Sequence, residues 1–242
     1  MKQYLVFDIE TSAINWDALS DSQQEYLTRG AESEEDVEKV KFEMALSPLT
    51  SQVVCIGLQL MQEENGEWKQ LNKAAFSTKP GYNKNELEEI DLESGNKCFI
   101  GSEEKIMNDF WSILSKYEYC ELISFNGRGF DAPFLMMRSA LLGIRPSRNL
   151  MAGTKFNYPL HIDLADELTF FTPSRYGATR RYNFDFFARS FGIISPKAEG
   201  VDGSMVGELY RNGEVAEIAE YCLRDVSATW ELFLKWYNLL RF

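Results

Sequence analysis

Four acidic residues lie in segments of the chain that otherwise have the composition of a protein core. They are Asp8 and Glu10 within YLVFDIET, Asp131 after FNGRGF, and Asp225 after YCLR. Burying a carboxylate costs several kcal/mol unless a cation compensates for its charge. A divalent metal ion held by carboxylate oxygens is the simplest compensation. The four acids therefore predict a site for divalent cations.

The periodicity of the surrounding segments indicates that these acids can meet. Residues i and i+2 of a strand face the same side of a sheet, so Asp8 and Glu10 point together if their apolar segment is a buried strand. In the last predicted helix, at residues 214–237, Asp225 belongs to an inward stripe and Tyr221 lies one turn before it. The stripe consists of Ile218, Cys222, Asp225, Thr229, Leu232 and Trp236. A phenol and a carboxylate are therefore expected to face one pocket.

Asp131 begins a predicted helix directly after a strand at residues 121–125, at the carboxyl end where open α/β sheets place their sites. Structural roles are open for each acid. Asp131 would also serve as a helix N-cap with Pro133 in the first turn, and the two roles can coexist. In the structural alternative, Asp225 pairs only with Arg224 and the ring of Tyr221 packs in the core. Asp8 and Glu10 would then be surface residues at the exposed edge of a strand. Four such acids together favour the metal site.

Length and composition favour a single domain over residues 1–242, with 45% hydrophobic and 14% aromatic residues. No segment approaches the roughly 18 consecutive apolar residues of a membrane helix, and the chain begins with a strand instead of a signal peptide. We therefore expect a cytoplasmic protein that does not bind membranes. Four dispersed cysteines and a single histidine, His161, make neither a disulfide framework nor a zinc site plausible, so oxygen ligands remain.

The formal net charge of −12 is unusual for a binder of nucleic acid backbones, which is normally basic. Much of the acidic excess lies at residues 32–43 and 86–93, which we expect to be solvated helix or loop faces. Basic residues gather in the second half of the chain. They include Arg145, Arg148, Arg175, Arg180, Arg181, Arg189 and Lys197. A local basic rim around an acidic, metal-binding site would suit a substrate end that is held by few contacts.

The order of predicted elements indicates an α/β fold with a mixed sheet flanked by helices. Strands at residues 4–9, 52–61 and 68–76 are expected to form an antiparallel meander, with a turn at 63–66. The later elements alternate between helix and strand and end in helices. They are expected at 102–117 (helix), 121–125 (strand), 131–142 (helix, ended by Gly143), 160–164 (strand), and 183–191, 204–210 and 214–237 (helices). Residues 15–48 are expected to form a helical insertion after the first strand.

Three of these segments resemble the three motifs of the DEDD superfamily of 3'-5' exonucleases, which have a ribonuclease-H-like fold. The segments are FDIET at 7–11, NGRGFD at 126–131 and YCLRD at 221–225, in the same order and with similarly wide separation. The resemblance is strongest with the stand-alone bacterial exonucleases related to the proofreading domain of B-family DNA polymerases. It extends to residues 161–164, 184–186, Lys197 and 202–204.

The last motif indicates the subtype. This superfamily carries either a tyrosine four residues before the final aspartate or a histidine five residues before it, and here Tyr221 and Glu220 occupy those positions. The chain therefore resembles the tyrosine (DEDDy) subtype. The insertion is long and acidic, which departs from the pattern of the family and leaves open the path of the substrate beside the first strand.

The resemblance implies phosphodiester hydrolysis with two Mg²⁺ or Mn²⁺ ions roughly 4 Å apart. Asp8 would bridge both ions, Glu10 and Asp225 would complete the site that prepares the nucleophile, and Asp131 would hold the second ion through water. Tyr221 would orient the attacking water, because a phenol with a pKa near 10 is a poor base at neutral pH. The resemblance thus assigns catalysis to these five residues.

Contacts with substrate are expected outside the metal ligands. Thr11 would bind the 3' hydroxyl of the terminal nucleotide or be an ordinary strand-end threonine. Asn126 would meet sugar or phosphate, and Phe130 would stack on a base or pack in the core. Residues 175–182 would form a flexible clamp or a solvated loop. The residues expected to bind substrate are Thr11, Asn126, Phe130, Arg180, Arg181 and Lys197, whereas Asp163 and Asp166 lie near a strand end and are not expected to be ligands.

These features imply a metal-dependent 3'-5' exonuclease that acts on single-stranded or frayed 3' ends, with DNA preferred over RNA. One alternative is an exoribonuclease similar to ribonuclease D. A second is a catalytically silent module that binds nucleic acid or a protein partner, although such a module would have no reason to keep four costly acids. Proofreading, DNA repair and RNA turnover are all compatible with this set of ligands.

Overall fold

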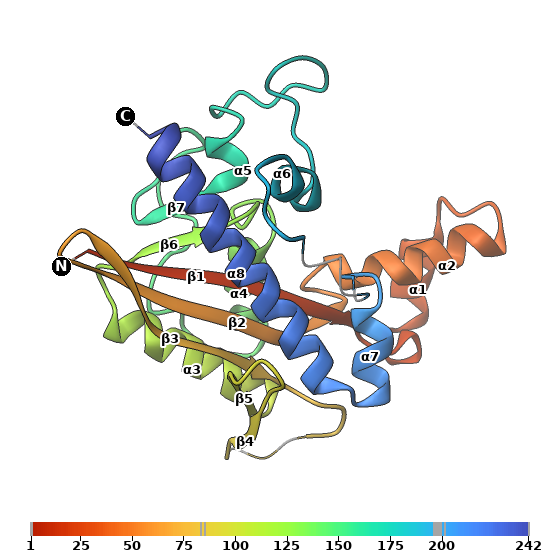
Figure 1. Cartoon of the computed structure of the whole chain (residues 1–242). Coiled ribbons are helices and arrows are strands. Elements are labelled where there is room, and N and C mark those ends of the chain that lie inside the picture. The colour runs from red at the N-terminus through yellow and green to blue at the C-terminus, as the bar shows by residue number, and fades with distance from the viewer. Residues whose placement is uncertain (1, 83, 85, 196–199, 201, 242) are drawn as a thin grey trace.

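The computed structural model describes residues 2–82, 84, 86–195, 200 and 202–241, and within them the chain forms a seven-stranded mixed sheet with helices on both faces (Figure 1). The strands are β1 (Gln3–Ala13), β2 (Ser51–Glu64), β3 (Glu67–Ser77), β4 (Glu88–Asp91), β5 (Lys97–Ile100), β6 (Glu121–Ser124) and β7 (His161–Asp163). The α-helices are α1 (Asp21–Thr28), α2 (Glu34–Glu43), α3 (Glu103–Lys116), α4 (Asp131–Leu141), α5 (Leu164–Glu167), α6 (Phe184–Ser190), α7 (Val206–Asn212) and α8 (Val215–Leu239). Two 3₁₀ helices, η1 (Trp16–Ala18) and η2 (Met44–Leu46), flank α1 and α2.

The sheet has the order β4-β5-β3-β2-β1-β6-β7. β1, β2 and β3 form the expected antiparallel meander, with Asn65 and Gly66 at positive φ in the β2–β3 turn. β6 runs parallel to β1, β7 runs parallel to β6, and β5 runs parallel to β3. The prediction of a mixed α/β sheet flanked by helices is therefore confirmed.

The expectation that residues 86–93 form a solvated helix or loop face is wrong in part. This acidic segment contains β4, which pairs antiparallel with β5 and extends the sheet beyond β3. Both strands have only four residues, and the side chains of β4 are mostly exposed, so neither strand carries a clear alternation of apolar residues. The short helix α5 was also not expected from the sequence, because a single turn is too short for a helical pattern.

Side-chain alternation along β1 divides the core between the two faces of the sheet. Leu5 and Phe7 pack with the apolar faces of α3 and α4. Tyr4 and Val6 pack with α8 on the other face, where Figure 1 shows α8 crossing the sheet. Since side chains alternate with a period of two, the acids at positions 8 and 10 also face α8.

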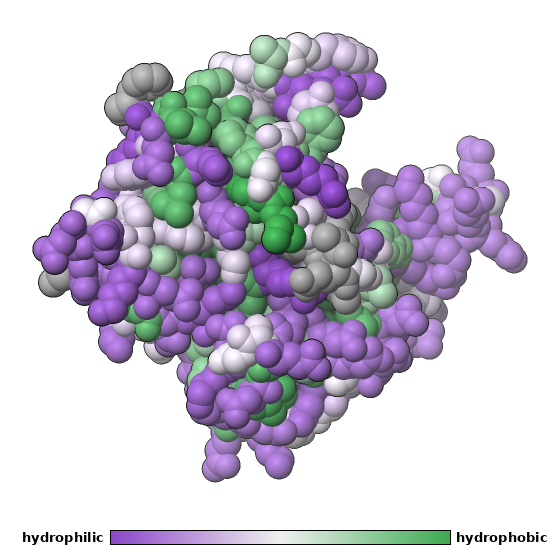
Figure 2. Space-filling view, in the orientation of Figure 1, coloured by the Kyte–Doolittle hydropathy of each residue, from purple (hydrophilic) through white to green (hydrophobic). Residues whose placement is uncertain are grey.

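Residues 14–50 connect β1 to β2 through η1, α1, α2 and η2, so the helical nature of the expected insertion is confirmed. Figure 1 shows α1 and α2 projecting beyond the end of β1, and Figure 2 shows this lobe as largely hydrophilic. Within the described residues, no helix combines the length and the apolar character that crossing a bilayer requires.

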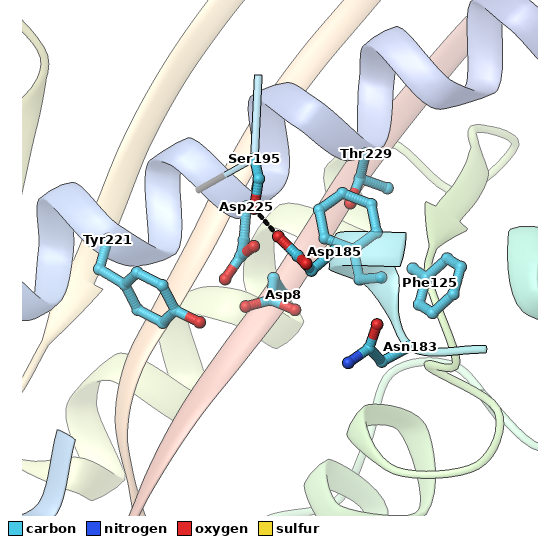
Figure 3. Close-up of a pocket in the computed structure, with 9 residues that line it drawn as sticks. Asp8, Phe125, Asn183, Asp185, Ser195, Tyr221, Asp225 and Thr229 are labelled. Atoms are coloured by element: carbon cyan, nitrogen blue, oxygen red, sulfur yellow. Dashed lines mark hydrogen bonds between the residues drawn. The ribbon is translucent and has the colours of Figure 1, made fainter. Parts of the chain in front are cut away.

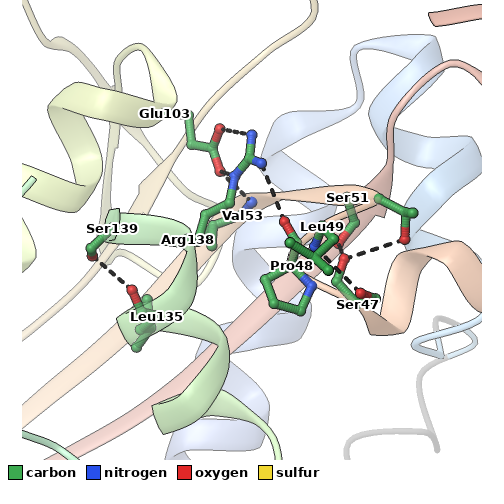
Figure 4. Close-up of polar contacts among 10 residues, drawn as sticks. Ser47, Pro48, Leu49, Ser51, Val53, Glu103, Leu135, Arg138 and Ser139 are labelled. Carbon is green, nitrogen blue, oxygen red and sulfur yellow. Dashed lines mark hydrogen bonds and ion pairs between the residues drawn. The ribbon is translucent and has the colours of Figure 1, made fainter. Parts of the chain in front are cut away.

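A partly buried ion pair holds the end of the insertion against the sheet (Figure 4). Arg138 of α4 binds both carboxylate oxygens of Glu103, at 2.7 and 2.8 Å, and also donates to the carbonyl of Pro48 at 3.3 Å. Glu103 in turn accepts the backbone N–H of Val53 at 2.8 Å. Bidentate pairs of this kind have a defined geometry, so the return of the chain into β2 is held in place.

Candidate active site

β1 places the first two acids side by side. One carboxylate oxygen from each of Asp8 and Glu10 and the Sγ atom of Cys222 all lie within 4.8 Å of one another. Glu10 is only 8% exposed. The register between β1 and β2 shifts between Glu10 and Thr11, an irregularity of the kind that often re-aims side chains beside functional sites.

α8 brings a phenol and a third carboxylate to the same place. Tyr221 and Asp225 line one pocket with Asp8, as Figure 3 shows. The close approach of α8 to the sheet depends on Gly57, the β2 partner of Asp8, because a Cβ at this position would lie 2.8 Å from Sγ of Cys222. The glycine therefore allows the helix to lie near enough for its carboxylate to join the site.

Asp131 joins the acids from the opposite direction. It is buried, and its Oδ1 accepts the backbone N–H of Ile9 at 3.0 Å. Because Ile9 lies between Asp8 and Glu10, this bond places the Asp131 carboxylate beside theirs. The N-cap interpretation is wrong, since Phe130 is the N-cap residue of α4 and Asp131 is already in its first turn.

The loop before Asp131 is held by a buried carboxylate at the end of β7. Asp163 accepts the backbone N–H groups of Asn126 and Arg128, both at 2.8 Å, and caps α5 by accepting from Ala165 at 3.0 Å. Asn126 has a positive φ of 62°, so the loop turns sharply there. Asp163 thus positions the second motif through backbone hydrogen bonds.

The clustered acids raise one another's pKa values. Burial raises the pKa of Asp8 well above its ordinary value, and the charges of Asp131, Asp225 and Glu10 raise it further. Burial and the charge of Asp225 likewise raise the pKa of Glu10 well above its ordinary value. Burial raises the pKa of Asp131 to about 7, although backbone hydrogen bonds oppose the shift. The fully ionised cluster is therefore unfavourable unless a cation shares the site.

The environment of Tyr221 keeps its phenol protonated. Burial raises its pKa above the ordinary value of 10.0, and the nearby charges of Asp225, Glu10 and Asp8 raise it further. At neutral pH the hydroxyl group is consequently a hydrogen-bond donor and not a base. This agrees with a role in positioning.

Comparisons with known proteins show the family of the chain. Residues 75–241 match the family model described as "Predicted 3'-5' exonuclease related to the exonuclease domain of PolB". The chain belongs to this family. A structural neighbour is the family B DNA polymerase of the archaeon Pyrobaculum calidifontis, with a TM-score of 0.55 and 17% sequence identity over 98% of this chain and 25% of the polymerase. The likeness shows a shared ribonuclease-H-like fold, and no curated protein matches the sequence.

The acids of this 3'-5' exonuclease form a donor set suited to hard cations. Exonuclease domains of this kind depend on metal ions, and carboxylate oxygens are the ligands that Mg²⁺ and Mn²⁺ prefer. Asp8 and Glu10 could hold such an ion together with the carboxylates beside them. The Cys222 thiol lies 3.7 Å from Oδ2 of Asp8, and burial raises its pKa well above the ordinary value.

The raised pKa of Asp131 predicts how the metal-free exonuclease responds to pH. The folded state holds a proton on this carboxyl between its ordinary pKa of 3.8 and about 7, whereas the unfolded state releases it. The free energy of unfolding should therefore fall as pH rises through this window in the presence of chelator. At neutral pH, Mg²⁺ or Mn²⁺ at 100 times its Kd should add about 2.7 kcal/mol, or roughly 5–10 °C in melting temperature.

Thermal melts at pH 4 to 8, with chelator or with Mg²⁺, measure this response. Asp131→Asn serves as the matched variant, because its side chain is nearly isosteric but does not ionise. Its melting temperature should fall less with rising pH than that of the wild type. Equal pH dependence in the two proteins, together with no effect of Mg²⁺ or Mn²⁺, would contradict the prediction.

The structure adds a fifth carboxylate that is not among the acids expected at the site. Asp185 of α6 lines the pocket that holds Asp8, and Figure 3 shows it directed toward the acids. It pairs with Arg189 at 2.8 Å and accepts a hydrogen bond from Ser195. In the sequence it lies two residues after the N-cap Asn183, so its pattern is that of an ordinary first-turn acid.

Thr11 and Phe130, both expected to bind substrate, make contacts within the protein. The Thr11 hydroxyl donates to the carbonyl of Ala45 at 2.7 Å, so it tethers the insertion to β1. Phe130 is half-buried and packs against Phe134 and the core on the α3 and α4 face. Lys197 lies outside the described residues.

Asn126 and Arg181, both expected at the substrate, are brought together. Oδ1 of Asn126 accepts from Nη2 of Arg181 at 2.8 Å, and Arg181 also lies 3.6 Å from Asp166. Arg180 stacks on the ring of Tyr182 at 4.8 Å. The expected basic segment therefore reaches the second motif of the exonuclease.

Proposed function

We propose that this exonuclease hydrolyses phosphodiester bonds at single-stranded or frayed 3' ends, preferentially of DNA, by a two-metal-ion mechanism of the tyrosine (DEDDy) subtype. One observation carries the proposal: carboxylates from β1, α4 and α8 converge beside Asp8, and a protonated tyrosine faces them. Hydrolysis of this kind needs carboxylates to hold cations and a donor to orient water, and both are present.

The residues divide the work as follows. Asp8, Glu10, Asp131 and Asp225 would hold two Mg²⁺ or Mn²⁺ ions, which supply charge stabilisation for the attacking and leaving oxygens when bound. Tyr221 orients the attacking water through its hydroxyl group, because its raised pKa prevents it from accepting the proton at neutral pH. These five residues form the proposed catalytic set.

A single strand is favoured by the aromatic surface near the second motif. The ring of Tyr182 stacks on that of Phe186 at 4.1 Å and 9°, and Arg180 covers the ring of Tyr182. Phe186 is 51% exposed. Stacked aromatic rings with an arginine offer a flat surface for unpaired bases, whereas paired bases present no free face. We propose that Arg180, Arg181 and Asn126 guide the strand toward the acids.

The remaining features support a single exonuclease domain over residues 1–242, since 98% of the chain is covered by the structural neighbour. The four cysteines are free and buried, which suits a reducing compartment such as the cytoplasm. The likeness to a DNA polymerase at 17% identity supports DNA as the preferred substrate.

Digestion of matched oligonucleotides tests the function. With Mg²⁺ or Mn²⁺, we expect stepwise release of mononucleotides from the 3' end of labelled single-stranded DNA, slower release from blunt duplex DNA and from RNA, and none with chelator. Faster digestion of RNA would favour the exoribonuclease alternative. Binding of either strand without hydrolysis under any metal condition would favour a silent binding module.

A further inference from the structure

A second cavity is lined by Glu10, two residues along β1 from Asp8, which lines the pocket that holds Tyr221. It has a volume of about 430 Å³, which is within the usual range for small-ligand sites of about 300–1,000 Å³. Its lining comes from the end of β1, the insertion, Phe130 and α7. The lining residues that matter here are Glu10, Thr11, Phe42, Ala45, Leu46 and Arg211. Because Glu10 of the proposed catalytic set lines this cavity, a group bound here is adjacent to the bond that is cut.

The insertion supplies an apolar wall of this cavity. Phe42 and Leu46 are 58% and 59% exposed, although both are large apolar side chains. They line the cavity from the last turn of α2 and from η2. Figure 2 shows hydrophobic side chains at the base of the otherwise hydrophilic lobe, where it meets the body. Exposed apolar surface grouped beside a functional site indicates a binding surface.

Hydrogen bonds hold this wall in register with the catalytic strand. The Thr11 hydroxyl donates to the carbonyl of Ala45 at 2.7 Å, and the Thr50 hydroxyl donates to that of Met44 at 2.8 Å. The backbone carbonyl of Thr50 accepts the backbone N–H of Ile14 at 3.0 Å. The wall is therefore attached to the strand that carries Asp8 and Glu10.

The cavity lining carries charges of both signs, with Lys41 and Arg211 beside the acids Glu10 and Glu208. Lys41 pairs with Glu38 at 2.7 Å, whereas Arg211 of α7 lines the cavity and forms no ion pair among the residues described by the structure. An aromatic face next to an available guanidinium group is the combination that binds an unpaired base and its phosphate. The wall offers no polar side chain between Phe42 and Leu46 other than Glu43, which lines a different cavity.

We propose that Phe42, Ala45 and Leu46 of the insertion form the binding wall for the unpaired base of the 3'-terminal nucleotide, with Phe42 stacking on the base. This inference rests on the proposed function and assigns a role to the insertion. Stacking requires a free base face but reads base identity weakly. The wall therefore selects unpaired ends of any sequence, while the acids perform the hydrolysis.

A double-mutant cycle tests the stacking of Phe42 on the terminal base. It removes the aromatic ring from the protein and the base from the substrate. Two single-stranded DNA substrates are compared, one with an ordinary 3'-terminal nucleotide and one with an abasic 3'-terminal residue. Stacking of one base corresponds to roughly a tenfold effect. Phe42→Ala should lower kcat/KM about tenfold on the ordinary end and leave it unchanged on the abasic end. Tyr26→Ala, which removes an aromatic ring that is 61% exposed in α1 and lines another cavity, should change neither.

The proposal would be overturned if Phe42→Ala lost kcat/KM equally on both ends or on neither. The same loss of kcat/KM in Tyr26→Ala would also overturn it. A binding measurement keeps it testable apart from catalysis. A strand with 2-aminopurine at its 3' terminus is titrated with protein in chelator, where stacking should quench fluorescence with the wild type and with Tyr26→Ala but not with Phe42→Ala. Equal quenching by all three proteins would refute the wall. Failure of the proposed function would instead appear as no hydrolysis by the wild type.

Discussion

Asp8→Ala is expected to lower the rate of mononucleotide release at least about a thousandfold while leaving the protein folded. A thousandfold loss corresponds to about 4 kcal/mol of transition-state stabilisation. The reason is the position of Asp8 within the cluster, where Glu10, Asp131 and Asp225 all act on its pKa. Removal of this carboxylate takes away the proposed shared ligand of both cations. Steady-state digestion of labelled single-stranded DNA in Mg²⁺ measures the loss.

Two controls separate catalysis from folding in this experiment. Asp91→Ala removes an exposed carboxylate of the edge strand β4 and should leave the rate unchanged. The metal-free Asp8→Ala protein should melt at or above the temperature of the wild type, because one of several mutually repelling buried charges is gone. Retention of wild-type activity by Asp8→Ala would refute the proposed catalytic site.

Asp163→Ala is expected to destabilise the fold by about 3 kcal/mol, which corresponds to roughly 6–12 °C in melting temperature for a chain of this length. Asp163 is fully buried and accepts three backbone N–H groups, from Asn126, Arg128 and Ala165. The alanine leaves these donors without an acceptor. Burial raises the pKa of Asp163, so part of the loss is offset when its charge is removed. Denaturant or thermal unfolding measures the difference.

Asp163→Asn provides a graded comparison. Its remaining carbonyl oxygen can replace Oδ1, which accepts from Asn126 and Ala165, but its amide group cannot accept from Arg128 as Oδ2 does. The destabilisation should therefore be about half that of the alanine variant. If the alanine variant is as stable as the wild type, the loop of the second motif does not depend on this carboxylate.

Much of the proposed catalytic set could be located from the sequence because local periodicity controls it. The period of two along β1 places Asp8 and Glu10 on one face, and the helical stripe of α8 places Asp225 inward with Tyr221 one turn earlier. These relations hold within a single element. They need no knowledge of which other element packs against it.

The sequence also indicated the helical character of the insertion but not its place in the site. Thr11 was expected either at the substrate or as an ordinary strand-end threonine, and neither expectation included the bond from its hydroxyl group to the carbonyl of Ala45, 34 positions away. Asp185 has the pattern of an ordinary first-turn acid, and only the packing of α6 directs it into the pocket with Asp8. Such contacts depend on the relative placement of distant elements, which local pattern does not encode.

The sequence alone therefore determined the mixed α/β architecture and the acids with their faces, because strand and helix periods dictate which side chains point inward. Tertiary structure decided the rest. It alone showed that Asp131 binds the backbone of Ile9, that β4 and β5 extend the sheet, and that Phe42 and Glu10 line one cavity. The physical reason is that these features arise from contacts between segments far apart in the chain, whose geometry is determined only when the whole core packs.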